Sequence, residues 1–118
     1  MSAKLFHEII STYRRHGWTL RSVLLRPATR NSLAADAVEL FEGSRLMDAE
    51  FDALWFARAS HGGREAWELR LVAEQQYALF EAFEADETEE ERDEVRLEME
   101  NKMREHTAAN PDSTAAAN

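Results

Sequence analysis

The fold is decided by residues 51–73, which read FDALWFARASHGGREAWELRLVA. Gly62 and Gly63 separate two runs rich in aromatic and aliphatic residues. Such a glycine pair suits a two-residue turn that needs positive φ angles. The stretch therefore predicts a β-hairpin with strands over 51–60 and 65–73.

The pairing within this hairpin predicts which side chains share a face. A turn centred on the two glycines pairs residue 60 with 65, 58 with 67, 56 with 69, and 54 with 71. One face then carries the apolar side chains of the core, which are Leu54, Phe56, Trp67, Leu69 and Leu71. Arg58 lies opposite Trp67 on that face. Trp55 lies opposite Arg70 on the other face, in a geometry that allows a cation–π contact.

A helix and a strand are expected before the hairpin. Apolar residues at helical spacing predict a helix over 3–16, and Gly17 can close it in the left-handed conformation. Residues 18–25 alternate in the manner of a strand. Pro27 ends that strand because proline cannot donate to a strand ladder.

The segment that leads into the hairpin has two interpretations. Residues 32–41 favour a helix because they are rich in alanine, and a short strand through Val38 and Leu40 is the alternative. Residues 44–52 are expected to form a connection that contains a short strand near 45–47.

Two further helices are expected after the hairpin. Residues 77–83 predict a short helix. Thr88 and Glu91 have the spacing of a capping box, which predicts the start of a long charged helix over 88–106. The apolar residues of this helix form a narrow stripe wide enough for one edge contact, made of Val95, Met99 and Met103.

These elements predict one α+β domain over 1–106, followed by a disordered polar tail over 107–118. A lone hairpin is only marginally stable, so we expect it to pair with the strand over 18–25. The predicted architecture is a small antiparallel sheet of three or four strands with helices packed on one face.

Composition excludes several kinds of chemistry and location. The chain has 118 residues, 44% of them hydrophobic, and no cysteine. The absence of cysteine excludes disulfides, thiolate zinc sites and iron–sulfur clusters. No apolar run resembles a signal peptide or a membrane span, so we expect a cytoplasmic protein with no membrane partner.

Charge is unevenly distributed along the chain, whose formal net charge is −9. Residues 1–35 hold six basic residues and one acid, whereas residues 74–105 hold thirteen acids and four basic residues. Either the acidic helix lies near the basic segment and neutralises it, or the two regions form separate surfaces. The net charge makes nucleic-acid binding an unfavoured function, with only Arg14, Arg15, Arg21 and Arg26 to support it.

Motifs for metal, cofactor or catalytic chemistry are not found. His7 and Glu8 begin a zinc-protease motif, but Ser11 stands where its second histidine is required. The sequence has no glycine-rich phosphate loop, and the acidic run at 86–94 lacks the central glycine of a calcium loop. We therefore expect no metal and no cofactor, and a non-enzyme is favoured over an enzyme.

The candidate binding site is a group of tryptophans and arginines on the hairpin, made of Trp55, Arg58, Trp67 and Arg70. Ordinary packing explains such a group, because tryptophans pack and arginines stack on them. The functional interpretation is that aromatic walls with a guanidinium bind an anionic ligand or the carboxylate of a partner.

Three functions follow, in order of preference. The first is a non-catalytic protein-interaction or regulatory module. Its partner is a second copy, bound through the Val95, Met99 and Met103 edge or through the edge of the sheet, or else a basic protein. The second is a small anionic-ligand binder or enzyme, with Arg58 or Arg70 as anchor and His61 as acid–base group. Nucleic-acid binding through the basic N-terminal segment is the third.

Overall fold

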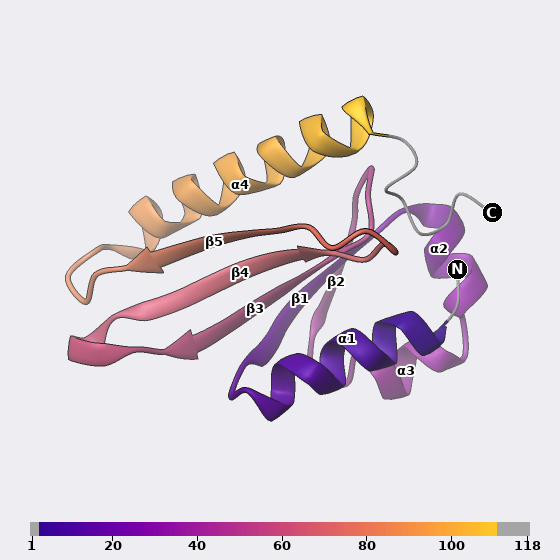
Figure 1. The fold of residues 1–118 in the computed structure, drawn as a ribbon, viewed down its shortest axis with the longest axis horizontal. Coiled ribbons are helices and arrows are strands. Elements are labelled where there is room, and N and C mark those ends of the chain that lie inside the picture. The colour runs from indigo at the N-terminus through magenta and orange to yellow at the C-terminus, as the bar shows by residue number, and fades with distance from the viewer. Residues whose placement is uncertain (1–2, 111–118) are drawn as a thin grey trace.

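A five-stranded sheet forms the centre of this α+β fold, and helices cover both of its faces (Figure 1). The computed structural model describes residues 3–110. The strand order is β2-β1-β3-β4-β5, and only the pair of β1 and β2 is parallel. The strands are β1 (Thr19–Leu25), β2 (Arg45–Asp48), β3 (Ala53–Ala59), β4 (Glu65–Leu71) and β5 (Ala78–Phe83). The helices are α1 (Ala3–Arg15), α2 (Pro27–Leu33), α3 (Asp36–Leu40) and α4 (Glu89–Ala109).

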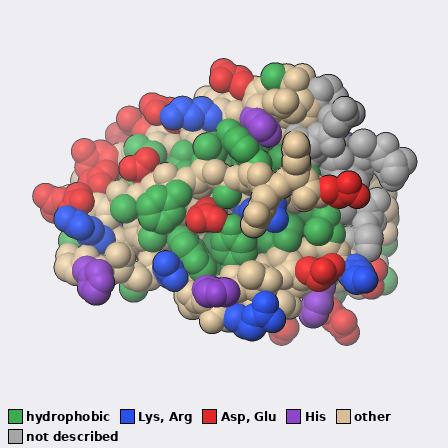
Figure 2. All heavy atoms as spheres, in the orientation of Figure 1, with side chains coloured by type: hydrophobic (Ala, Val, Ile, Leu, Met, Phe, Trp, Pro, Cys, Tyr) green, Lys and Arg blue, Asp and Glu red, His purple; other side chains and the backbone are tan. Residues whose placement is uncertain are grey.

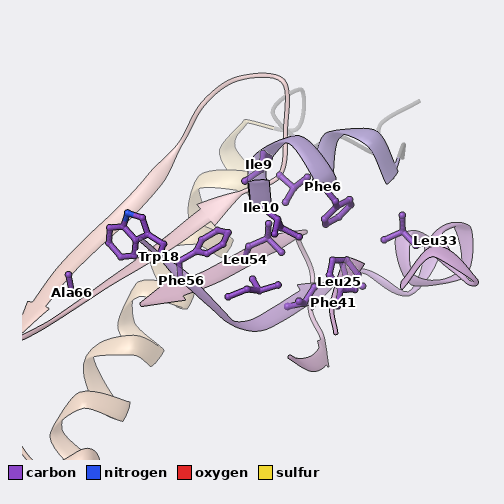
Figure 3. Close-up of a cluster of buried hydrophobic side chains, with 13 residues drawn as sticks. Phe6, Ile9, Ile10, Trp18, Leu25, Leu33, Phe41, Leu54, Phe56 and Ala66 are labelled. Atoms are coloured by element: carbon purple, nitrogen blue, oxygen red, sulfur yellow. The ribbon is translucent and has the colours of Figure 1, made fainter. Parts of the chain in front are cut away.

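The front face of the sheet, defined as the face that packs against α1, carries one hydrophobic core (Figure 3). The apolar stripe of α1 supplies Phe6, Ile9 and Ile10, and all three side chains are buried. The short helices α2 and α3 extend this cover beyond α1. The other core residues of this face are Trp18, Leu20, Val23, Leu25, Leu33, Phe41, Leu54, Phe56, Ala66 and Val72.

The back face, defined as the face that packs against α4, carries a second core. Met99 and Met103 of α4 lie there against the sheet. The sheet residues of this core include Leu24, Phe51, Ala53, Trp55, Ala57, Trp67, Leu69, Leu71 and Phe83. The predicted α+β class is therefore confirmed, but the prediction of helices on one face is wrong, because one central sheet serves two cores.

The sheet also has more strands than predicted. Residues 78–83, which were predicted as part of a short helix, form the edge strand β5. Its pairing with β4 runs from Ala78 opposite Arg70 to Phe83 opposite Glu65. The predicted antiparallel arrangement fails only for β2, which lies parallel to β1 because α2 and α3 carry the chain back between them.

The predicted hairpin exists, but its register differs by one residue. Residues 60–64 form the loop, in which the Ser60 amide donates to the Arg64 carbonyl over 2.8 Å. Ala59 therefore pairs with Glu65, and Ala57 pairs with Trp67. The predicted pairing of residue 60 with 65 leaves four residues in the loop, whereas the observed loop over 60–64 has five. A one-residue shift moves each side chain of one strand to the other face relative to its partner.

A bulge in β1 places the side chains before and after Arg21 on different faces of the sheet from those that strict alternation predicts. Leu20 pairs with Phe56 and Ser22 with Trp55, so Arg21 is an extra residue without a partner in β3. The predicted strict alternation from Trp18 to Leu24 therefore breaks at Arg21. Leu20 belongs to the front core and Leu24 to the back core.

A buried carboxylate joins β1, α2 and the start of β3. Asp52 is 3% exposed and accepts hydrogen bonds from the backbone N–H of Arg26 at 2.9 Å and from the Thr29 hydroxyl at 2.8 Å. The Arg26 guanidinium forms an ion pair with the same carboxylate at 2.9 Å. Leaving a buried charge without its partners is strongly destabilising, so this contact fixes the corner where α2 begins.

The remaining predictions concern boundaries. Helix is the correct choice between 32 and 41, although α2 starts earlier, with Pro27 in its first turn. The short strand predicted near 45–47 is confirmed as β2. The helix α4 begins at the predicted capping box and continues through Ala109, into the stretch predicted as a tail. Residues 111–118 of that tail lie outside the described residues.

Candidate functional site

Trp55 and Trp67 lie side by side on the back face, beneath α4. Their rings make an edge-to-face contact with centroids 5.8 Å apart. Both side chains are buried, with exposed fractions of 2% and 8%. The one-residue register shift brings them together, because Trp67 now shares a face with Ala57 and Trp55.

Arg58 and Arg70 lie on the opposite face of the sheet from these tryptophans. The Arg58 guanidinium lies 4.5 Å from the ring centroid of Trp18 and donates to the His16 carbonyl at 2.8 Å. The structure therefore does not bring the four predicted site residues together. Arg58 does line a shallow hollow with His61, but its guanidinium is already engaged within the fold.

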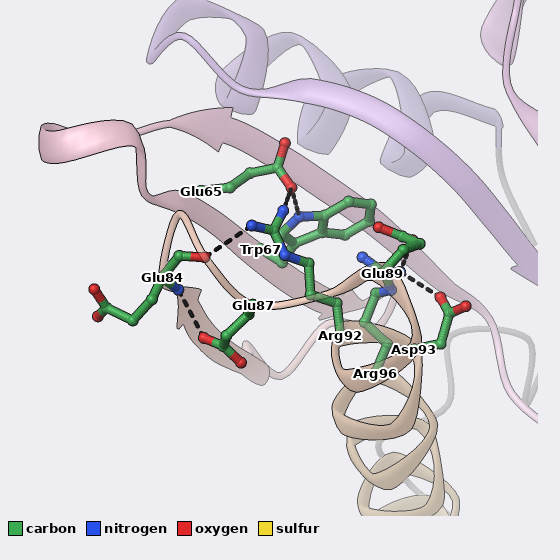
Figure 4. Close-up of polar contacts among 8 residues, drawn as sticks. All are labelled: Glu65, Trp67, Glu84, Glu87, Glu89, Arg92, Asp93 and Arg96. Carbon is green, nitrogen blue, oxygen red and sulfur yellow. Dashed lines mark hydrogen bonds and ion pairs between the residues drawn. The ribbon is translucent and has the colours of Figure 1, made fainter.

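Two other arginines lie against the Trp67 ring, and Figure 4 shows one of them, Arg96. The guanidinium of Arg96 on α4 lies 4.3 Å from the Trp67 ring centroid, and that of Arg21 lies 5.2 Å from it. The bulge in β1 places Arg21 on this side. Sequence reasoning missed both partners because one depends on an unpaired bulge residue and the other on where α4 crosses the sheet.

The polar groups around the tryptophans are largely engaged by one another. The Glu65 carboxylate accepts from the Trp67 indole N–H at 2.6 Å and from Arg92 at 3.2 Å. The Trp55 indole N–H donates to Glu100 of α4 at 2.9 Å. These contacts hold α4 against the sheet, so the indole N–H groups and the Arg92 guanidinium are engaged within the fold.

A groove of about 430 Å³ remains between α4 and the strands β1 and β2. Its strand side carries Arg21 and Arg45, and its helix side carries Glu89, Asp93 and Glu100. Arg96 forms ion pairs with both Glu89 and Asp93. Because charges of both signs line this groove, its electrostatics do not select an anionic ligand.

The predicted interface edge of α4 faces the sheet. Met99 is 5% exposed and Met103 is fully buried, and Val95 packs against the same core. The apolar residue of α4 that does reach the surface is Leu97, which is 57% exposed and borders the groove.

Tyr13, Glu68 and Arg70 form a polar cluster on the front face. The Tyr13 hydroxyl donates to the Glu68 carboxylate, and its ring stacks on Phe56 with centroids 4.1 Å apart. Burial and the hydrogen bond to Glu68 raise the pKa of Tyr13. Burial also lowers the pKa of Arg70, whose guanidinium donates to the Leu71 carbonyl.

An exposed aromatic side chain marks the part of the front face that α1 leaves uncovered. Phe80 of β5 is 57% exposed and contacts the edge of Trp18, with ring centroids 6.5 Å apart. Hydrophobic side chains gather over the middle of this face, and acidic side chains cluster at the end where α4 begins (Figure 2). Sequence reasoning missed Phe80 because it placed residues 77–83 in a helix.

The outer edge of β5 offers backbone groups for pairing. The Leu71 amide donates to the Tyr77 carbonyl at 2.9 Å. In an antiparallel ladder, alternate residues point their backbone groups to the same side. Leu79, Glu81 and Phe83 therefore bond to β4. The outward N–H and C=O groups of Ala78, Phe80 and Ala82 make up the β5 edge. All three residues are exposed.

No family model, curated protein or solved structure matches this chain. Among residues 3–110, no three histidine or carboxylate side chains come together in a way that would hold a metal ion. Across the same residues, no helix combines the length and apolar character needed to cross a membrane.

Proposed function

We propose that this chain is a non-catalytic interaction module that binds an extended segment of another polypeptide along the β5 edge. One observation carries the proposal, which is that the exposed Phe80 sits in the middle of β5, an edge strand whose outer side pairs with no strand among residues 3–110. Adding a strand to an exposed sheet edge is a general mode of peptide recognition, in which backbone hydrogen bonds give affinity and side-chain contacts give specificity.

The two edges of the sheet differ in how well they are protected. The other edge strand, β2, has four residues and begins and ends with the charged residues Arg45 and Asp48. Short length and charge are the usual devices that keep an edge from pairing. β5 has six residues, contains no proline and carries a single charge, on Glu81. An open apolar edge of this kind favours pairing with another strand.

The neighbourhood of Phe80 supplies the contact surface for the side chains of such a segment. Trp18 borders Phe80, and Tyr13 in turn contacts Trp18 with centroids 6.0 Å apart. Aromatic residues are enriched where interfaces gain most of their binding energy. A bound strand would therefore place its inward side chains against this aromatic row while its backbone pairs with β5.

Selection from a library of random nine-residue peptides displayed on phage tests the proposal. We expect the immobilised protein to enrich peptides with alternating apolar residues. For a selected synthetic peptide, we expect hydrogen exchange at the amides of Ala78, Phe80 and Ala82 to slow on binding. Phe80→Lys should weaken that binding by about thirtyfold or more, because it replaces an interface anchor with a charge.

The matched control is Leu97→Lys, because Leu97 has the same exposed fraction as Phe80 and lies on the back face. It should leave peptide binding unchanged. If selected peptides bind equally well to Phe80→Lys, or if they protect amides elsewhere, the β5 edge is not the binding surface.

A further inference from the structure

We infer that the strand that pairs with β5 is β5 of a second copy of this chain, in a two-fold antiparallel pair centred on Phe80. The inference rests on the proposed function and names its partner. Two five-stranded sheets would then join into one continuous sheet, with both α1 helices on the front face and both α4 helices on the back face.

The backbone supports this pairing along the whole strand. The outward residues Ala78, Phe80 and Ala82 are spaced symmetrically about Phe80 within the bounds of β5. Centring the pair on Phe80 places Phe80 opposite Phe80 of the second copy and Ala78 opposite its Ala82. Each outward N–H and C=O of one strand then meets an outward group of the other.

The neighbouring registers pair the edge less completely. A two-fold antiparallel pair keeps each face continuous, so the nearest alternatives are centred on Leu79 or on Glu81. Centring on Leu79 places Ala82 opposite residue 76, beyond the start of β5. Centring on Glu81 places Ala78 opposite residue 84, beyond the end of β5, and sets two Glu81 carboxylates directly opposite each other, which is destabilising.

The side chains of β5 are self-complementary in the favoured register. On the front face, the small residues Ala78 and Ala82 flank the large Phe80 on both sides, which leaves room for two Phe80 rings to meet. Aromatic pairs of this kind contribute beyond the apolar area that they bury. On the back face, Glu81 lies opposite Leu79 of the second copy, so the two Glu81 carboxylates are diagonal neighbours and are not directly opposite each other.

The pair would also cover the apolar surface that one chain leaves open. Tyr13, Trp18 and Phe80 form a row of contacting rings that ends at the edge strand. In the pair, Phe80 of the second copy extends this row, and the two-fold axis relates it to the same row of the second copy. The same patch on both subunits thus forms the interface, as in other two-fold dimers.

Single cysteines test the register directly, because the chain has no cysteine of its own. In the favoured register, Leu79 and Glu81 of the second copy form a non-hydrogen-bonded pair with Cα atoms about 4.5 Å apart, within the range for a disulfide. An equal mixture of Leu79→Cys and Glu81→Cys should therefore form a mixed disulfide dimer on mild oxidation. Neither variant should form such a dimer alone.

Each other pattern of cross-linking overturns the inference. Self-cross-linking of Leu79→Cys alone shows the register centred on Leu79, and self-cross-linking of Glu81→Cys alone shows the register centred on Glu81. Leu97→Cys, with a thiol at an exposed site away from the edge, measures cross-linking by collision. If the mixture cross-links no faster than Leu97→Cys, β5 does not pair with itself.

Sedimentation of the wild-type chain keeps the test independent of how the cysteine variants fold. We expect a monomer–dimer equilibrium that Phe80→Lys weakens by about thirtyfold or more and that Leu97→Lys leaves unchanged. A wild-type chain that stays monomeric at all concentrations, yet binds selected peptides at the amides of Ala78, Phe80 and Ala82, refutes self-pairing and retains the proposed function. If neither peptides nor a second copy occupy that edge, both proposals fail.

Discussion

Tyr13 links the last turns of α1 to two strands of the sheet through one side chain. Its ring stacks on Phe56 of β3, and its hydroxyl donates to Glu68 of β4. The carboxylate and burial both favour the neutral phenol over the phenolate, so the pKa of Tyr13 is raised in the folded state. The raised pKa makes the stability of the protein depend on pH in the alkaline range.

The variant Tyr13→Phe isolates the contribution of the Tyr13 hydroxyl to the pH dependence of the free energy of unfolding. A group whose pKa is raised by folding contributes stability that is fully present below its unfolded pKa, about 10 for tyrosine, and that is lost as pH rises through the folded value. The wild type should therefore lose free energy of unfolding above pH 10 more steeply than Tyr13→Phe does. At pH 7 the variant should be less stable by about 1–3 kcal/mol, because Glu68 loses a hydrogen bond.

Urea unfolding of both chains at pH 7 and at several values above pH 10 measures the difference. A difference in free energy that stays constant across this range would show that the Tyr13 hydroxyl is not coupled to the Glu68 carboxylate.

The tryptophan and arginine group shows where residue-level reasoning reaches its limit. Trp67 contacts the guanidinium groups of Arg96 and Arg21, and not that of Arg58, which the predicted pairing places opposite it. Which arginine meets which tryptophan depends on the hairpin register and on the β1 bulge. Each is decided by a single extra residue that leaves no periodic signal in the sequence.

At the scale of the element, α4 begins where local chemistry predicts. The Thr88 amide donates to the Glu91 carboxylate at 2.8 Å, and the Glu91 amide donates to the Thr88 hydroxyl oxygen at 3.1 Å. This capping box satisfies backbone donors that have no partner within the helix. The hydrogen bond from the Thr88 amide lowers the pKa of Glu91.

Thr88→Ala should lower the free energy of unfolding by about 1 kcal/mol at pH 7, whereas Thr88→Ser should leave it nearly unchanged because serine keeps the capping oxygen. A group whose pKa is lowered by folding contributes stability above its unfolded pKa, about 4.3 for glutamate, and that stability is lost as pH falls through the folded value. Alanine keeps the amide hydrogen bond to Glu91 but loses the one that the Thr88 hydroxyl donates to the same carboxylate at 3.1 Å, which also lowers the pKa of Glu91. The cost of Thr88→Ala should therefore shrink below pH 4. Urea titrations at pH 7 and pH 3 measure it, and an equal cost for alanine and serine would exclude the cap as the cause.

The contrast with β5 explains which elements the sequence predicts. The helices α1 and α4 have local signals, namely an apolar stripe in one and a capping box in the other. Residues 77–83 contain alanine, leucine and glutamate, which favour helices, so their local preference opposes the strand. Pairing with the long strand β4 overrides that preference, and such tertiary context cannot be read from a short segment.

At the scale of the whole molecule, the sheet separates two charged surfaces. The basic helix α1 lies on the front face and the acidic helix α4 lies on the back face, so the sheet stands between them (Figure 1). Among the basic residues of the first 35, Arg26 and Arg30 form ion pairs with Asp52 and Asp48. For α1 this arrangement favours a surface distinct from α4, whereas Arg21 of the basic segment faces the acidic side chains of α4 across the groove.

The two cores should nevertheless unfold together, because β1, β3 and β4 each contribute buried side chains to both. Fluorescence of Trp18→Phe reports the back core through Trp55 and Trp67, and fluorescence of the Trp55→Phe, Trp67→Phe double variant reports the front core through Trp18. Within each variant, we expect the urea midpoint by fluorescence to coincide with that by circular dichroism. An earlier midpoint for the back-core signal would show that α4 detaches before the sheet unfolds.

The order of elements along the chain means that the helices covering the two faces of the sheet are made at different stages of synthesis. Everything that covers the front face is made before the last strand, since α1, α2 and α3 all precede β3. The cover of the back face, α4, follows β5. Domains begin to fold while the ribosome is still adding residues. A nascent chain thus has a period in which every strand of the sheet has been made but the helix that covers the tryptophan-bearing face has not. The time that the ribosome takes to translate and release residues 89–109 sets how long that face is open to chaperones or to neighbouring nascent chains.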